Sequence, residues 1–173
     1  MNGVLSTYAH PRFVPLAILL ASSAVLISAL AAQHLFGLEP CALCIYQRVP
    51  YVITAMVATV GVGLGGEGRA GGVVVGLCAV VFLTSAWLAL YHVGVEQHWW
   101  SSIAACGTSG APGDMTLEQL RTGLAAGKPP KPCDQVDWTL FGVSLAGFNA
   151  LVSLGLAVFS LAGARAILRG KSP

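Results

Sequence analysis

The sequence predicts an all-α membrane protein built as a four-helix transmembrane bundle with one short and one long outer loop. Of its 173 residues, 55% are hydrophobic and only 9% are charged, whereas soluble domains average about 25% charged residues. Four apolar stretches reach the roughly 20 residues that a helix needs to cross a bilayer. The net charge of +2 is small and scattered, which argues against nucleic-acid binding.

The predicted spans cover residues 14–36, 45–65, 71–95 and 140–163 of one transmembrane domain, residues 1–173. A short loop, 37–44, follows the first span and a long one, 96–139, follows the third. The first stretch also has features of a secretory signal, because Arg12 precedes it and small residues occur near its end. We interpret it as a span for two reasons. Its apolar run is long for a signal, and a first crossing is needed to bring the chain to the side of the membrane from which the next span begins.

Basic residues predict the orientation, because they accumulate in cytoplasmic loops. One side of the membrane would carry Arg12, Arg69, Arg165, Arg169 and Lys171, and the other Arg48, Arg121, Lys128 and Lys131. Two of the latter four lie far into the long loop, where this rule weakens. We therefore expect both termini in the cytoplasm and both loops outside.

A dithiol stands at the beginning of the second span, where residues 39–48 read EPCALCIYQR. A helix N-terminus carries partial positive charge and favours a thiolate, which we expect at Cys44. Arg48 follows one turn later, where it can stabilise that thiolate or hold an anionic or carbonyl-bearing ligand. Ionisable residues at membrane depth indicate a functional site. In the alternative, Arg48 extends to lipid headgroups and Cys41 and Cys44 form a static clip.

Two further cysteines, Cys106 and Cys133, lie in the long loop, on the same predicted side as the dithiol. Four cysteines can hold zinc, but zinc ribbons show two Cys-x-x-Cys pairs and these two residues are 27 apart. We therefore expect disulfides and no metal. Cys78 lies inside the third span and is interpreted as packing. His92, near the outer end of that span, is either an interfacial polar residue or a ligand.

The long loop also contains a candidate surface helix. Asp114 can cap a helix that carries Leu117, Leu120 and Leu124 at helical spacing. This segment is either a short helix that lies on membrane lipid or a loop with one helical turn.

These motifs together resemble the disulfide-bond formation protein B (DsbB) family over nearly the whole chain. The resemblance rests on CALCIYQR at the second span, YH near the end of the third, a cysteine pair in the long loop, and CDQVDWTLFG before the fourth. It implies a multi-pass enzyme of the bacterial inner membrane, a thiol:quinone oxidoreductase. Its partner would be DsbA, a periplasmic dithiol oxidase of the thioredoxin fold, and its activity would sustain disulfide-bond formation.

The resemblance also implies roles for the four cysteines. Cys41 and Cys44 match the pair that is coupled to quinone. Cys106 and Cys133 match the loop pair that oxidises DsbA, and Cys106 matches the cysteine that forms the mixed disulfide.

A quinone, ubiquinone or menaquinone, is the cofactor that the resemblance implies. Arg48 matches the quinone-site arginine of the family and His92 a quinone-proximal histidine. DsbA has a potential near −120 mV and structural disulfides lie below about −300 mV, so oxidising DsbA requires a strong terminal oxidant. Three alternatives stay open: a quinone oxidoreductase of the vitamin K epoxide reductase type, a DsbB variant dedicated to one partner, and a non-enzymatic membrane scaffold with structural disulfides.

Overall fold

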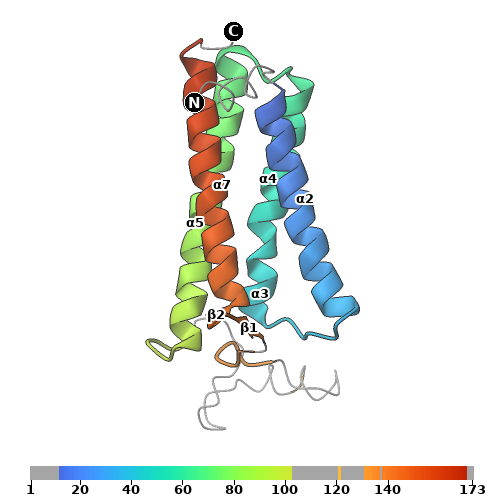
Figure 1. Ribbon diagram of the computed structural model, residues 1–173, viewed down its shortest axis with the longest axis vertical. Helices are drawn as coiled ribbons and strands as arrows, with labels where there is room; N and C mark the ends of the chain where they lie inside the picture. The colour runs from blue at the N-terminus through green and yellow to red at the C-terminus, as the bar shows by residue number, and fades with distance from the viewer. Residues whose placement is uncertain (1–11, 103–120, 122–130, 137, 171–173) are drawn as a thin grey trace.

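The computed structural model describes residues 12–102, 121, 131–136 and 138–170, and it shows a bundle of long helices (Figure 1). The elements are α2 (Phe13–His34), α3 (Ala42–Tyr46), α4 (Arg48–Gly63), α5 (Gly68–Glu96), β1 (Thr139–Leu140), β2 (Val143–Ser144) and α7 (Leu145–Leu168). Helices α3 and α4 together form one segment, Ala42–Gly63. Within the described ranges, four segments are long and apolar enough to cross a membrane, which confirms the predicted four-helix bundle.

Three predicted boundaries differ from the structure in a way that matters: the start of the second span and both ends of the fourth, which ends at Leu168 and not at residue 163. The second span begins at Ala42, not at residue 45, because Cys41 caps a first helical turn that already includes Cys44. The fourth span begins at Leu145, not at residue 140, because residues 139–144 form an antiparallel hairpin. Phe141 and Gly142 both adopt positive φ there, at 53° and 78°, as tight hairpin turns require.

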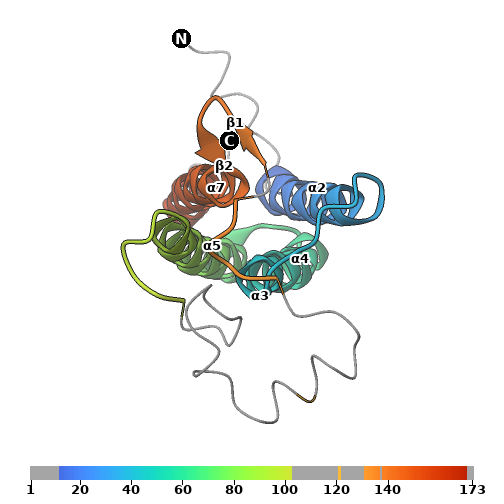
Figure 2. The same cartoon turned by 90° about the horizontal axis from the view of Figure 1, so that it is seen from below.

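The helices follow one another around the bundle in the order α2, α4, α5, α7 (Figure 2). Contacts are most extensive between α5 and α7 and are sparse between α2 and α7. The buried face of α7 consists mainly of small residues at intervals of three and four: Ala146, Ala150, Ser153, Ala157, Ser160, Gly163 and Ala164. Small residues let membrane helices approach closely, because lipid provides no hydrophobic driving force between them.

Hydrogen bonds between buried side chains connect the helices, as expected where no water can satisfy polar groups. Ser22 Oγ lies 3.0 Å from Thr54 Oγ1 and joins α2 to α4. The Tyr51 hydroxyl lies 2.7 Å from Ser153 Oγ, which lies 3.0 Å from Ser85 Oγ. One small polar cluster therefore joins α4, α7 and α5.

The turn between α4 and α5 leaves no room for a side chain at Gly71. A Cβ atom there would lie 2.5 Å from the backbone carbon of Gly66. We expect Gly71→Ala to destabilise the fold by about 1–3 kcal/mol, the usual cost of overpacking. Gly155→Ala is the matched control, because a Cβ there meets nothing within 4 Å. Thermal unfolding of the purified protein should show a lower midpoint for the first variant only, and equal midpoints would contradict the packing described.

Candidate redox and ligand site

The Cys-x-x-Cys segment builds its own turn of helix, which brings its two sulfur atoms together. Cys41 is the N-cap of α3, with an extended ψ of 171°, and Cys44 lies in the first turn. The two Sγ atoms are 3.1 Å apart, and both residues are thiols. The backbone N–H of Cys44 donates to Cys41 Sγ at 3.3 Å. This N–H at the helix start stabilises the sulfur of Cys41, and the Cys41 thiol in turn donates to Cys44 Sγ, where the sequence predicts the thiolate.

A third cysteine, from the long loop, packs directly against this pair. Cys133 is only 2% exposed and belongs to a buried cluster with Cys41, Leu43 and Val95. A hydrogen bond between the thiols of Cys133 and Cys41 raises the pKa of Cys133 well above its usual range, and burial adds to the shift. The same bond lowers the pKa of Cys41, but a hydrogen bond with Cys44 and burial outweigh it and raise that pKa to about 11. Both thiols are therefore protonated near neutral pH.

His92, on α5, lies between these two cysteines. Its Nε2 is 3.6 Å from Cys41 Sγ and 3.3 Å from the peptide oxygen of Cys133. The side chain is buried, and Glu96, one turn along the helix, approaches Nε2 to 4.0 Å. One imidazole ring therefore contacts both cysteine-bearing segments.

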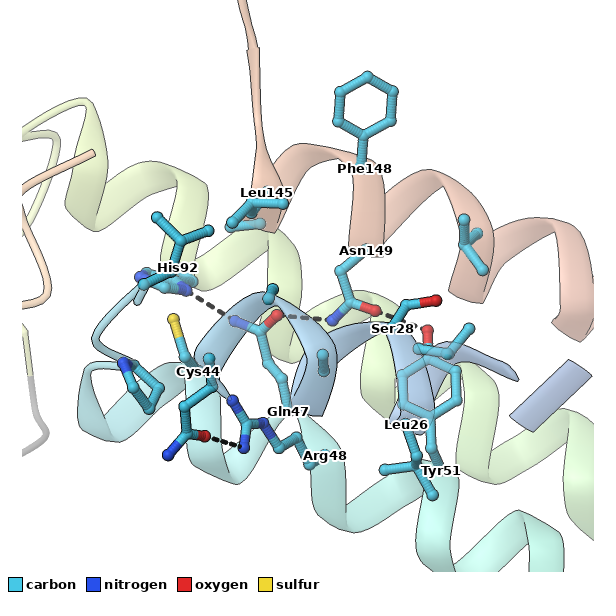
Figure 3. A pocket seen from close by; sticks show the side chains of 18 of the residues that line it. Leu26, Ser28, Cys44, Gln47, Arg48, Tyr51, His92, Leu145, Phe148 and Asn149 are labelled. Carbon is cyan, nitrogen blue, oxygen red and sulfur yellow. Dashed lines mark hydrogen bonds between the residues drawn. The ribbon is translucent and has the colours of Figure 1, made fainter. Parts of the chain in front are cut away.

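The other ring nitrogen of His92 is held by a run of polar side chains that we term the amide chain, consisting of Gln47, Asn149 and Tyr51 (Figure 3). Gln47 Nε2 lies 2.7 Å from His92 Nδ1. Asn149 Nδ2 donates to Gln47 Oε1, and the Tyr51 hydroxyl donates to Asn149 Oδ1 at 2.6 Å. The amide chain thus joins α5 to α7 and α4 next to the dithiol.

A pocket of about 440 Å³ lies beside Cys44, between α2, α4 and α7. Its apolar wall comes from α2 and α7 and includes Leu26, Ala29, Phe148 and Val152. Its polar end carries Cys44, Arg48, His92 and the amide chain (Figure 3). Arg48 Nη1 donates to Gln33 Oε1 at 2.8 Å. Concave, largely apolar pockets with a few convergent polar groups are typical small-molecule sites.

The structure thus brings together most of the residues that the sequence indicated. Cys41, Cys44 and His92 place their ligand atoms within 4.8 Å of one another, a spacing that could also hold a metal ion. Cys78 is fully buried in a separate core cluster with Val75 and Phe82, as expected for packing. Cys106 and the candidate surface helix around residues 114–124 lie outside the described part of the chain, except for Arg121.

Sequence reasoning missed the amide chain and Glu96. Asn149 is a strongly polar residue inside an apolar span, and this is a recognised indication of function. Gln47 immediately precedes Arg48 in the cysteine motif. Either residue indicated a polar site. The hydrogen bond between Asn149 and Gln47, however, joins two segments that are far apart in the chain, so neither residue predicted the other.

The chain is similar to known proteins over most of its length. The family described as "Disulfide bond formation protein DsbB" matches residues 11–163. A protein of Polaromonas sp. named "Disulfide bond formation protein B" is 31% identical over 155 residues, which cover 88% of this chain and 90% of that protein. A protein of the same name from Albidiferax ferrireducens is 34% identical over 157 residues, covering 88% and 86% respectively. No solved structure shows a significant match.

The family match covers the segments of the chain that build the candidate site. The matched residues include the dithiol, the loop that carries Cys133 and most of the four spans. The family comprises oxidoreductases involved in disulfide bond formation. This chain, a multi-pass membrane protein, therefore belongs to the DsbB family.

Proposed function

We propose that this protein is a thiol:quinone oxidoreductase of the bacterial inner membrane that oxidises a DsbA-like periplasmic protein. The observation that carries the proposal is the pocket beside Cys44. It places a redox-capable dithiol at one end of a cavity whose walls are formed by membrane-spanning helices. A soluble substrate can reach the dithiol end of the bundle, and a lipid-soluble oxidant can reach the pocket.

The residues of the pocket fit a quinone. Its volume of about 440 Å³ lies within the range of about 300–1,000 Å³ typical of ligand pockets. Leu26, Ala29, Phe148 and Val152 offer an apolar surface to the ring and its tail, and Arg48 offers guanidinium N–H donors to a ring oxygen. A bound quinone, ubiquinone or menaquinone, supplies the capacity to accept two electrons and two protons from the dithiol.

The contact between Cys133 and Cys41 supports a route for the electrons. In the oxidised enzyme, a partner thiolate attacks Cys106, the loop disulfide breaks, and its electron pair leaves on Cys133. The Cys133 thiolate attacks Cys41 Sγ, the bond between Cys41 and Cys44 breaks, and its electron pair leaves on Cys44. The second thiol of the partner then attacks its mixed disulfide with Cys106 and releases Cys106. Cys106 then attacks Cys133, which restores the loop disulfide and releases Cys41. Cys44, which lines the pocket, is thereby left as the thiolate next to the quinone site. The loop disulfide is renewed for the next partner molecule.

The arrangement of the cysteines also supports the proposed orientation. Cys41, Cys44 and Cys133 all lie at the end of the bundle where α3 and the hairpin are found (Figure 1). An oxidising compartment is where disulfides form and persist, so this end would face the periplasm and both termini the cytoplasm.

The orientation predicts opposite labelling at the two ends of the bundle. In a variant without native cysteines, Phe141→Cys would place a thiol on the hairpin, where Phe141 is 94% exposed. Arg169→Cys would place one at the exposed opposite end, after α7. A membrane-impermeant maleimide should label the first in intact spheroplasts and the second only after the membrane is permeabilised. The reverse pattern would overturn the orientation.

The electron route predicts separable defects for the two cysteine pairs. Cys106→Ser should abolish oxidation of a DsbA-like partner and still allow quinone to oxidise Cys41 and Cys44. Cys44→Ser should abolish quinone reduction. Cys78→Ala is the control, because Cys78 lies in the other core cluster and should not affect turnover. The redox state of each pair can be followed by alkylation and mass spectrometry, and full turnover by Cys106→Ser would refute the route.

Arg48 is expected to bind the quinone through its planar guanidinium group. Arg48→Lys keeps the charge but loses the fork of donors, and Arg48→Ala loses both. A charge-assisted hydrogen bond is worth about 1.5–3 kcal/mol, so the quinone KM should rise about tenfold to a hundredfold, and more in the alanine variant. Steady-state quinone reduction at saturating reduced partner measures this effect. Unchanged kinetics in both variants would contradict a role in quinone binding and would indicate that Arg48 only contacts lipid headgroups.

A further inference from the structure

The peptide oxygen of Cys133 shows which nitrogen of His92 carries the proton in this structure. A carbonyl oxygen can only accept a hydrogen bond, so the Nε2 atom that lies 3.3 Å from it must carry hydrogen. The carboxylate of Glu96, 4.0 Å from the same nitrogen, favours this proton as well. In the neutral ring the opposite nitrogen, Nδ1, then has a lone pair and must accept.

The amide chain agrees with this assignment at every link. Because His92 Nδ1 accepts, Gln47 must turn its NH₂ group toward it, which directs Gln47 Oε1 to Asn149. Asn149 must then offer its own NH₂ group to Gln47, which leaves Asn149 Oδ1 to accept from the Tyr51 hydroxyl. Reversing any one amide would oppose two donors or two acceptors. The chain therefore has a single direction, from Tyr51 to His92.

We propose that the amide chain holds His92 in the Nε2–H tautomer so that this N–H, shared with the peptide oxygen of Cys133, also donates to the sulfur of Cys41. The nitrogen lies 3.6 Å from Cys41 Sγ, within reach of a hydrogen bond to sulfur. Gln47, Asn149 and Tyr51 are positioning residues in this role, because they act through the imidazole. His92 acts on the reacting sulfur as a donor and not as a base.

The step that this donor assists follows from the proposed function, on which this part of the inference rests. When attack at Cys133 breaks the bond between Cys41 and Cys133, the electron pair leaves on Cys41 Sγ. The pKa of the Cys41 thiol is raised to about 11, so this sulfur is a poor leaving group without help. A hydrogen bond from His92 Nε2–H stabilises the thiolate as it forms. In the opposite tautomer a nitrogen lone pair would face the developing negative charge.

The tautomer can be read directly by nitrogen NMR of the full-length protein labelled with ¹⁵N-histidine at pH 8. Four histidines are present, and the His92 signal is identified by its loss in His92→Gln. We expect the proton of wild-type His92 on Nε2. Asn149→Asp replaces a donor by an acceptor, so Gln47 should reverse and the proton should move to Nδ1. If that variant does not fold, Gln47→Glu, which presents only acceptor oxygens to His92 Nδ1, should likewise bring a proton onto Nδ1.

A matched control separates this effect from a general loss of buried hydrogen bonds. Ser22→Ala removes the buried bond to Thr54 and lies outside the pocket, so it should leave the His92 tautomer unchanged. A wild-type proton on Nδ1, or a wild-type tautomer retained in a folded Asn149→Asp protein, would overturn the proposal. None of these spectra requires a partner or a quinone, so they do not depend on the proposed function.

The kinetic consequence is measured without quinone, in a single turnover of oxidised enzyme with a reduced DsbA-like partner. Release of the Cys41 thiol should be about tenfold slower in Asn149→Asp, the cost of one charge-assisted hydrogen bond. Ser22→Ala should match the wild type. An unchanged rate in a variant whose tautomer has reversed would refute the donor role. Absence of any exchange in the wild type would instead refute the proposed function and leave the tautomer result intact.

Discussion

The contacts of the His92 ring are the constraint on which the rest of the site depends. A buried imidazole is costly unless both nitrogens find partners. One nitrogen contacts Cys41 Sγ and the Cys133 peptide oxygen, so the ring holds together two segments that are remote in the sequence. The other requires a donor in the bundle interior, which Gln47 supplies. The dithiol, the loop cysteine and the polar end of the pocket are arranged around this one side chain.

The packing of the bundle explains why a pocket can exist beside the dithiol. Small residues on α7 allow close contact with α5, whereas α2 and α7 touch sparsely. The pocket lies on that loosely packed side, with Leu26 from one helix and Phe148 from the other on its wall. In water such a gap would be filled, but in a bilayer lipid tails cover an apolar opening at little cost. The dithiol can therefore contact the loop cysteine Cys133 on one side while Cys44 lines the pocket on the other.

Local sequence signals were sufficient for the spans, because hydropathy reports directly on burial in lipid. They placed the third span to within three residues at each end. The fourth was predicted too early, because Leu140 and Phe141 are apolar and yet belong to a hairpin that ends at Ser144. Hydropathy cannot distinguish an apolar hairpin from the first turn of a helix. The positive φ at Phe141, which is rare for a bulky residue, gave no sequence signal.

The candidate site could be predicted only in part. The spacing of Cys41 and Cys44 predicts their proximity, since residues three apart share one helical turn. The contact of Cys133 with Cys41 and that of Asn149 with Gln47 depend on how loops and helices meet in three dimensions. Only the resemblance to a family suggested in advance that the loop pair and the helical pair cooperate. The direction of the hydrogen bonds in the amide chain could not be predicted from the sequence, because it follows from the position of the Cys133 peptide oxygen next to His92 Nε2.

Transfer of electrons from a dithiol protein to quinone is tested most directly by mixing purified enzyme, a reduced DsbA-like protein and a soluble quinone. The quinone is followed by its absorbance and the thiols of the partner by alkylation. One quinone should be reduced for each disulfide formed in the partner, over many turnovers, and Cys44→Ser should stop both processes. Disulfide formation without quinone reduction, or no reaction of either kind, would contradict a pathway that runs from the loop through Cys41 and Cys44 into the membrane.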